Sequence, residues 1–253
     1  MLITATDIIK KSITLYKENT QLFLQYVVLL FFPNGLLSIL IVFLYRISGD
    51  RGTVNDGIFI GISMLLIITM SLVTIWVSLA FIRTVAARYE SKDAPHVRDA
   101  LHQATPLLWP AVWSSVLALL AAIGGFILLI IPGIILSLWF AFGMYAVALD
   151  EKNAVDALRM SKSLVQGRWW SVLWRLLAPG LVFGFLSILI EGLLSLPIEF
   201  MGEMPNLFIL LIFNLLATAG GLLVAPLLTA SSTILYLEMK KTPVPSPTPP
   251  ALS

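Results

Sequence analysis

Residues 58–82 read IFIGISMLLIITMSLVTIWVSLAFI and contain no charged side chain. A helix that crosses a bilayer needs roughly 20 apolar residues, because the hydrocarbon layer is ~30 Å thick and each residue adds about 1.5 Å. This stretch exceeds that length. It is therefore predicted to be a transmembrane helix, and it sets the class of the whole protein.

The composition of the rest of the chain agrees with this class. The chain has 253 residues, of which 58% are hydrophobic and 12% charged, and its mean hydropathy is +0.95. A soluble domain carries about 25% charged residues. The chain therefore lacks the polar surface that would cover a core in water, and an integral membrane protein is indicated.

Five further segments are long and apolar enough to span a bilayer. They cover residues 22–45, 107–131, 133–149, 170–196 and 207–237. Only Ile131-Pro132-Gly133 separates the third span from the fourth, and Pro followed by Gly favours a tight reversal. We expect a helical hairpin with Pro132 and Gly133 at its turn. The predicted fold class is all-α, a polytopic transmembrane bundle of about six spans.

Basic residues are distributed unevenly over this topology. When six spans alternate, fourteen of the sixteen Lys and Arg residues fall on one side, and only Arg46 and Arg51 fall on the other. Lys and Arg are enriched on the cytoplasmic side of membranes. The bias predicts a multi-pass protein of the inner (cytoplasmic) cell membrane with both termini in the cytoplasm. No signal peptide is expected, because the N-terminal residues lack an apolar segment followed by a cleavage site.

Three segments on the basic side have apolar residues at three- and four-residue spacing, which is typical of amphipathic helices at a membrane surface. They cover residues 4–18, 93–105 and 153–166. Each precedes a pair of spans, so the integral membrane domain, residues 1–241, is predicted to be a triple repeat. The repeat units cover residues 4–90, 93–149 and 153–238. Residues 242–253 contain five prolines and are predicted to form a disordered cytoplasmic tail.

The sequence offers few residues that could carry catalysis. It has no cysteines, no Gly-x-Ser-x-Gly elbow, no phosphate-binding glycine loop and no His-Glu-x-x-His motif. Its two histidines, His96 and His102, are six residues apart, which places them on different sides of a helix and argues against a shared metal site. We predict a protein that is not an enzyme and that uses no metal or cofactor.

Polar residues inside the spans allow two interpretations. Asn34, Glu191 and Asn214 could line a solute path, and Pro33-Asn34-Gly35 could interrupt the first span as in transporters with discontinuous helices. The alternatives are helix packing for the two asparagines and an interfacial position for the carboxylate of Glu191. Gly57-x-x-x-Gly61 and Gly180-x-x-x-Gly184 predict close helix contacts, within the chain or in a dimer.

The densest group of basic and aromatic side chains surrounds the start of the fifth span. It comprises Arg159, Lys162, Arg168, Trp169, Trp170, Trp174 and Arg175. The group could bind anionic phospholipid headgroups, since each basic residue near an anionic leaflet adds about 1 kcal/mol. It is also what a helix needs where it enters the membrane, with cations on the cytoplasmic side and Trp at the interface. Nucleic acid is not an expected partner, because no soluble binding module accompanies the group.

Residues 129–177 resemble a known family. Its pattern is followed by Ile131-Pro132-Gly133-Ile134, Asp150-Glu151, Ala157-Leu158-Arg159 and Gly167-Arg168-Trp169. The stretch is similar to the membrane domain of bacterial glycerophosphoryl diester phosphodiesterases and of related stand-alone membrane proteins. In those enzymes the chemistry belongs to a separate soluble barrel. We expect no counterpart of that barrel in this chain, so the resemblance does not imply the activity.

Two functions remain open at this point. The first is a non-catalytic membrane protein that engages lipid headgroups, or a membrane protein partner, through its basic amphipathic helices. The second is a small transporter or channel for a lipidic or amphipathic solute.

Overall fold

The computed structural model describes residues 2–49, 56–200 and 206–242, and these residues form helices without a strand. Six segments are long and apolar enough to cross a membrane. They are Thr20–Leu44, Ile60–Tyr89, Val97–Leu128, Ile130–Asp150, Trp169–Pro197 and Leu207–Lys241. The predicted class, an all-α multi-pass membrane protein with six spans, is confirmed. The predicted disorder of the tail concerns residues that, after Thr242, lie outside the described part of the chain.

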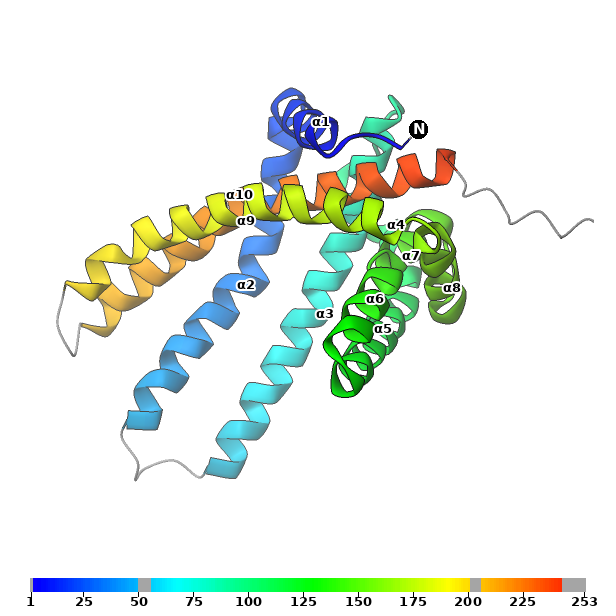
Figure 1. The fold of residues 1–253 in the computed structure, drawn as a ribbon. Coiled ribbons are helices and arrows are strands. Elements are labelled where there is room, and N and C mark those ends of the chain that lie inside the picture. The colour runs from blue at the N-terminus through cyan, green and yellow to red at the C-terminus, as the bar shows by residue number, and fades with distance from the viewer. Residues whose placement is uncertain (1, 50–55, 201–205, 243–253) are drawn as a thin grey trace, which may run out of the picture.

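Short helices alternate with the long apolar ones along the chain. In order they are α1 (Ala5–Glu18), α2 (Thr20–Gly49), α3 (Asp56–Tyr89), α4 (Val97–Ala104), α5 (Leu108–Leu128), α6 (Ile130–Phe140), α7 (Gly143–Asp150), α8 (Ala154–Val165), α9 (Trp169–Glu199) and α10 (Leu207–Lys241). Thus α1 precedes α2 and α3, α4 precedes α5 to α7, and α8 precedes α9 and α10 (Figure 1). This is the order that a triple repeat predicts, and the equivalence of the three units stays a prediction.

The reversal between α5 and α6 lies at Leu129, three residues before the predicted turn. Leu129 has extended backbone, with φ −165° and ψ 157°, whereas Pro132 and Gly133 lie in the first turn of α6. Proline is tolerated there because the first N–H groups of a helix have no partner inside the helix. Gly133 is instead the point of contact between the two helices, since a Cβ on Gly125 would lie 2.8 Å from its Cα.

The interruption of a span occurs in the fourth span and not in the first. Helix α2 runs unbroken through Pro33-Asn34-Gly35, and the Asn34 amide donates to the Leu30 carbonyl of the same helix at 2.8 Å. In the fourth span, α6 ends at Phe140 and α7 begins at Gly143. A discontinuous first span is therefore ruled out as the basis of a solute site.

A buried serine of α8 satisfies the backbone at this interruption. The Phe142 N–H donates to Ser161 Oγ at 3.1 Å, and Ser161 Oγ donates to the Trp139 carbonyl at 2.6 Å. Ser161 is fully buried. Irregular backbone at membrane depth persists only where the protein supplies such partners.

Replacing Ser161 by alanine is expected to destabilise the protein by about 1–3 kcal/mol, because a buried N–H and a buried carbonyl lose their partner. The matched control is Ser163→Ala, since Ser163 is exposed and its one hydrogen bond among the described residues is to the Met160 carbonyl of its own helix. Thermal unfolding in detergent, followed by tryptophan fluorescence, measures both variants. Equal melting temperatures for the two variants would contradict this role of Ser161.

The three short amphipathic helices bury their apolar faces against the spans. Helix α1 buries Ile8 and Leu15, and its Ser12 hydroxyl lies 2.9 Å from the Ser231 hydroxyl of α10. In α4, Ala100 and Ala104 are fully buried, as Ala157 is in α8. Their amphipathic pattern is thus explained by contact with other helices of the chain.

The buried core lies at the end of the molecule where α1, α4 and α8 pack against the spans. We call this end the basic end. From it the pairs α2–α3, α5–α6 and α9–α10 spread apart (Figure 1). The far part of α3 is accordingly exposed, with Met64 61% and Leu65 65% accessible. Such surface suits lipid contact, because lipid tails solvate apolar side chains.

The glycines of the predicted motifs whose surroundings the structure describes are not sites of close helix contact. An added Cβ on Gly61, Gly180 or Gly184 would meet no atom within 4 Å. The close approaches occur at other glycines, among them Gly125 and Gly133. The prediction of intramolecular packing at these motifs is therefore wrong for the glycines whose surroundings are described.

Candidate functional site

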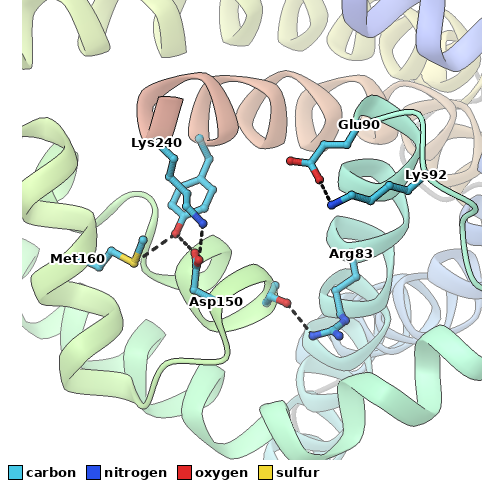
Figure 2. A network of polar contacts seen from close by, with 8 residues as sticks. Arg83, Glu90, Lys92, Asp150, Met160 and Lys240 are labelled. Atoms are coloured by element: carbon cyan, nitrogen blue, oxygen red, sulfur yellow. Dashed lines mark hydrogen bonds and ion pairs between the residues drawn. The ribbon is translucent and has the colours of Figure 1, made fainter. Parts of the chain in front are cut away.

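A polar network joins α7 to α10 at the basic end (Figure 2). Asp150, the last residue of α7, accepts hydrogen bonds from the Tyr236 hydroxyl and from the Lys240 ammonium group. The Tyr236 hydroxyl also lies 3.6 Å from Met160 Sδ of α8. The Asp150 side chain is only 16% exposed. Helices α7 and α10 thus meet at the carboxylate of Asp150, and α8 contacts the tyrosine hydroxyl bound to it.

Arg83 of α3 binds the end of the same helix α7. Its guanidinium donates to the Ala148 carbonyl at 2.9 Å and to Glu151 Oε1 at 3.0 Å. Glu151 terminates α7 in a left-handed conformation, with φ 52°. A cation is stabilising at this position, because the last carbonyl groups of a helix carry partial negative charge.

A second polar chain connects α1, α3 and α10. The Lys11 ammonium donates to the Tyr89 hydroxyl at 2.8 Å, and that hydroxyl donates to Glu238 Oε1 at 3.0 Å. Lys241 pairs with the same Glu238 oxygen at 2.9 Å. Hydrogen bonds and an ion pair of charged side chains therefore hold together the ends of α1, α3 and α10 that the predicted topology places on one side of the membrane.

Two arginines of the predicted lipid-binding group are bonded within the fold. Arg168 donates to the carbonyls of Leu164 at 2.7 Å and Met239 at 3.0 Å, and also to that of Thr242. Burial, with a smaller contribution from the charge of Arg175, lowers the pKa of Arg168. These bonds fasten the end of α10 to the start of α9.

Arg175 fastens the N-terminal residues in the same way. Its guanidinium donates to the carbonyls of Leu2 at 3.3 Å, Ser171 at 2.8 Å, and Ile3. With Arg168 on Thr242, both ends of the described chain lie at the basic end. That the two termini share one side of the membrane, and which side it is, stay predictions.

The other members of the group differ in exposure. Lys162 lies over the Trp139 ring, 4.4 Å from its centroid, whereas Arg159 is 77% exposed and pairs with Asp156 at 3.2 Å. Trp169 stacks on Trp170 with a centroid distance of 4.4 Å. Arg159 is thus the most exposed basic member of the group.

Exposed tryptophans lie in the first turns of helices α5 and α9. On α9, Trp170 is 67% and Trp174 60% exposed, and on α5, Trp109 is 64% and Trp113 57% exposed. Each pair is four residues apart, so each lies on one face of its helix. Tryptophan favours the membrane–water interface, so these pairs are consistent with an interface near the basic end.

The polar residues inside the spans do not form one site. Asn214 accepts a hydrogen bond from Ser38, and the Thr218 hydroxyl lies 3.2 Å from that of Ser38, which links α2 to α10. Glu191 accepts from Ser187 at 2.9 Å, and its Oε1 lies where a Cβ on Gly221 would be. Among the described residues, no hydrogen bond connects Glu191 to Asn34 or Asn214.

Sequence reasoning missed the residues that hold the basic end together. Arg83, Tyr236 and Ser161 carry its central contacts. Arg83 and Tyr236 are isolated polar residues beside or within an apolar run, and Ser161 is one of several polar residues between Arg159 and Arg168. The one available signal was the four-residue spacing of Tyr236 and Lys240, which places both on one face of α10.

Comparison with known proteins places most of these features in a family. Residues 103–239 match the family described as a domain of unknown function (DUF7847). The match begins in α4 and ends near the end of α10, so it includes Asp150, Ser161 and Tyr236. No curated protein and no solved structure matches the chain.

The resemblance of residues 129–177 to phosphodiesterase membrane domains is not addressed by this match and stays a prediction. The matched residues make up more than half of the chain. The protein therefore belongs to the DUF7847 family.

Proposed function

We propose that this chain is a non-catalytic membrane protein whose basic end, on the cytoplasmic side of the cell membrane, engages anionic lipid headgroups. The observation that carries the proposal is a division among the basic residues. Arg83, Arg168 and Arg175 bind partners inside the fold. A second set is exposed and has no ion pair within the described part of the chain: Lys10, Lys17, Arg88, Arg98 and Lys152.

The second set supports contact with a charged surface. Among the residues that the structure describes, none of these side chains forms an ion pair between two helices, so their charges can face a charged surface. Near an anionic leaflet each would add about 1 kcal/mol of attraction. The exposed tryptophans of α5 and α9 also support a position of the basic end near the membrane–water interface. The same exposed cations could bind a membrane protein with an acidic surface, and such a protein is the second partner that we propose.

A catalytic role has little support, because the carboxylates of the polar networks that join α3, α7 and α10 already have partners. Asp150 binds Lys240, Glu151 binds Arg83, and Glu238 binds Lys241. A general acid or base needs a carboxyl group that can reach a substrate. Transport is also less supported, since Asn34, Glu191 and Asn214 are not gathered into one path.

The proposal is tested by neutralising two cations of the second set, Lys152→Gln together with Arg98→Gln. We expect the double variant to lose bound anionic phospholipid by about thirtyfold in affinity, since two charges contribute about 2 kcal/mol. Native mass spectrometry of the protein extracted with its own lipids measures the retention. The control, Arg46→Gln with Arg51→Gln, makes the same change in net charge on the opposite side of the predicted topology. Equal retention in the two double variants would contradict the proposal.

A further inference from the structure

A groove lies where the start of α2 faces the start of α4. Gln21, Gln25 and His96 line its polar part, and Leu24, Val28 and Leu29 line its apolar part. Its volume is about 950 Å³, within the ~300–1,000 Å³ typical of small-molecule sites. The groove shares no residue with the network of Figure 2.

The lining of the groove changes from polar to apolar along α2. The first span begins at Thr20, and Gln21 and Gln25 occupy its first two turns. Val28, which is 68% exposed, lies seven residues beyond Gln21, or roughly 10 Å further along the helix. That distance takes the groove from the headgroup layer into the hydrocarbon layer of a bilayer. The lining of the groove therefore changes from polar to apolar in the same direction as a lipid molecule in the same membrane.

The polar part of the groove presents free hydrogen-bond donors. Gln21 and Gln25 are exposed, and their side-chain amides have no hydrogen bond within the described residues. The His96 side chain makes no capping bond to α4. Amide and imidazole N–H groups at this depth can donate to phosphate or ester oxygens.

A carboxylate lies at the rim of the groove. A smaller hollow of about 290 Å³ is lined by Glu18 and Asn19 and shares Gln21 and Gln25 with the groove. Glu18 is exposed and has no ion pair among the residues that the structure describes. A carboxylate beside phosphate-binding donors matches a headgroup that carries both a phosphate and an ammonium group.

We propose that the groove between α2 and α4 holds one glycerophospholipid with a primary-amine headgroup. The acyl chain lies along Leu24, Val28 and Leu29. The phosphate accepts from Gln21, Gln25 and His96, and the ammonium group donates to Glu18. This site is independent of the proposed function, because it selects a zwitterionic lipid through α2, whereas the exposed cations attract anionic lipids.

The test uses the full chain in nanodiscs that contain equal amounts of phosphatidylethanolamine and phosphatidylcholine. Native mass spectrometry after release measures the one-lipid complexes. We expect phosphatidylethanolamine to predominate several-fold, because the quaternary ammonium of phosphatidylcholine cannot donate to Glu18. Glu18→Gln should bring the ratio of the two lipids close to one. Equal retention of both lipids by the unmodified protein would overturn the choice of headgroup.

Blocking the groove provides the second arm. Val28→Trp should reduce both one-lipid complexes by about tenfold or more, because the indole would fill the apolar part. The control is Leu65→Trp, since Leu65 is 65% exposed on α3 and lies outside the groove. Equal lipid retention in the two tryptophan variants would overturn the site. Both probe lipids lack net charge, so a failure of the anionic-lipid proposal would leave this result unchanged.

Discussion

Replacing Asp150 by asparagine is expected to destabilise the protein by about 2–3 kcal/mol. The carboxylate accepts from the buried Tyr236 hydroxyl and pairs with Lys240, and hydrogen bonds to charged groups contribute about 1.5–3 kcal/mol. The asparagine would retain the shape but lose the charge, leaving Lys240 without its counterion. Thermal unfolding in detergent, followed by tryptophan fluorescence, measures the difference from the unmodified protein.

The control for this prediction is Glu90→Gln, which makes the same chemical change at an exposed ion pair. Its partner Lys92 is 70% exposed, and exposed pairs contribute about 0–1 kcal/mol. Lys240→Met, alone and combined with Asp150→Asn, then completes a double-mutant cycle. If the effects of the two single changes simply add, Asp150 and Lys240 do not stabilise the contact of α7 with α10 as a pair.

The predictable part of the fold is the part that depends on local sequence. The length of an apolar run determines whether a helix can cross the membrane. Each of the six spans is therefore predictable from its own segment, as residues 58–82 show. The spacing of Ala154, Ala157 and Leu158 indicates an amphipathic helix, because apolar residues three or four apart share a face. Whether such a face meets lipid or protein depends on residues far along the chain, and here it meets protein.

The turn of the hairpin shows why local rules place a break only approximately. Pro132 and Gly133 are the residues with the strongest turn preference, yet the chain reverses at Leu129. Proline suits the first turn of a helix as well as a loop. Glycine suits a close helix contact as well as a turn. The contact of Gly133 with Gly125 is what distinguishes these possibilities, and the sequence does not display it.

The arginines of the candidate site illustrate the same limit. Composition and position give Arg168 and Arg175 the pattern of interfacial anchors. The acceptors that they bind, the carbonyls of Met239 and Leu2, are 71 and 173 residues away in sequence. Every residue type has a main-chain carbonyl, so these acceptors cannot be recognised in the sequence. A charge pattern therefore cannot distinguish an arginine that contacts lipid headgroups from one that bonds to another part of the fold.

Replacing Gly125 by alanine is expected to destabilise the α5–α6 hairpin by about 1–3 kcal/mol, the usual effect of overpacking. The new Cβ would lie 2.8 Å from Gly133 Cα and 2.9 Å from Leu136 Cδ1. The leucine side chain can rotate away, but the backbone at Gly133 cannot yield without moving α6. Since α6 and α7 carry the interruption that Ser161 binds, we expect the loss to appear as a lower melting temperature of the whole protein.

The neighbouring glycine makes this prediction sharp. A Cβ on Gly124 would meet no atom within 4 Å. Gly124→Ala should therefore stabilise α5 by up to about 1 kcal/mol, the ordinary preference of a helix for alanine over glycine. Two identical substitutions at adjacent positions would then act in opposite directions, which helix propensity alone cannot produce. Stabilisation by both would show that the helices do not meet at Gly125, and the hairpin geometry would have to be abandoned.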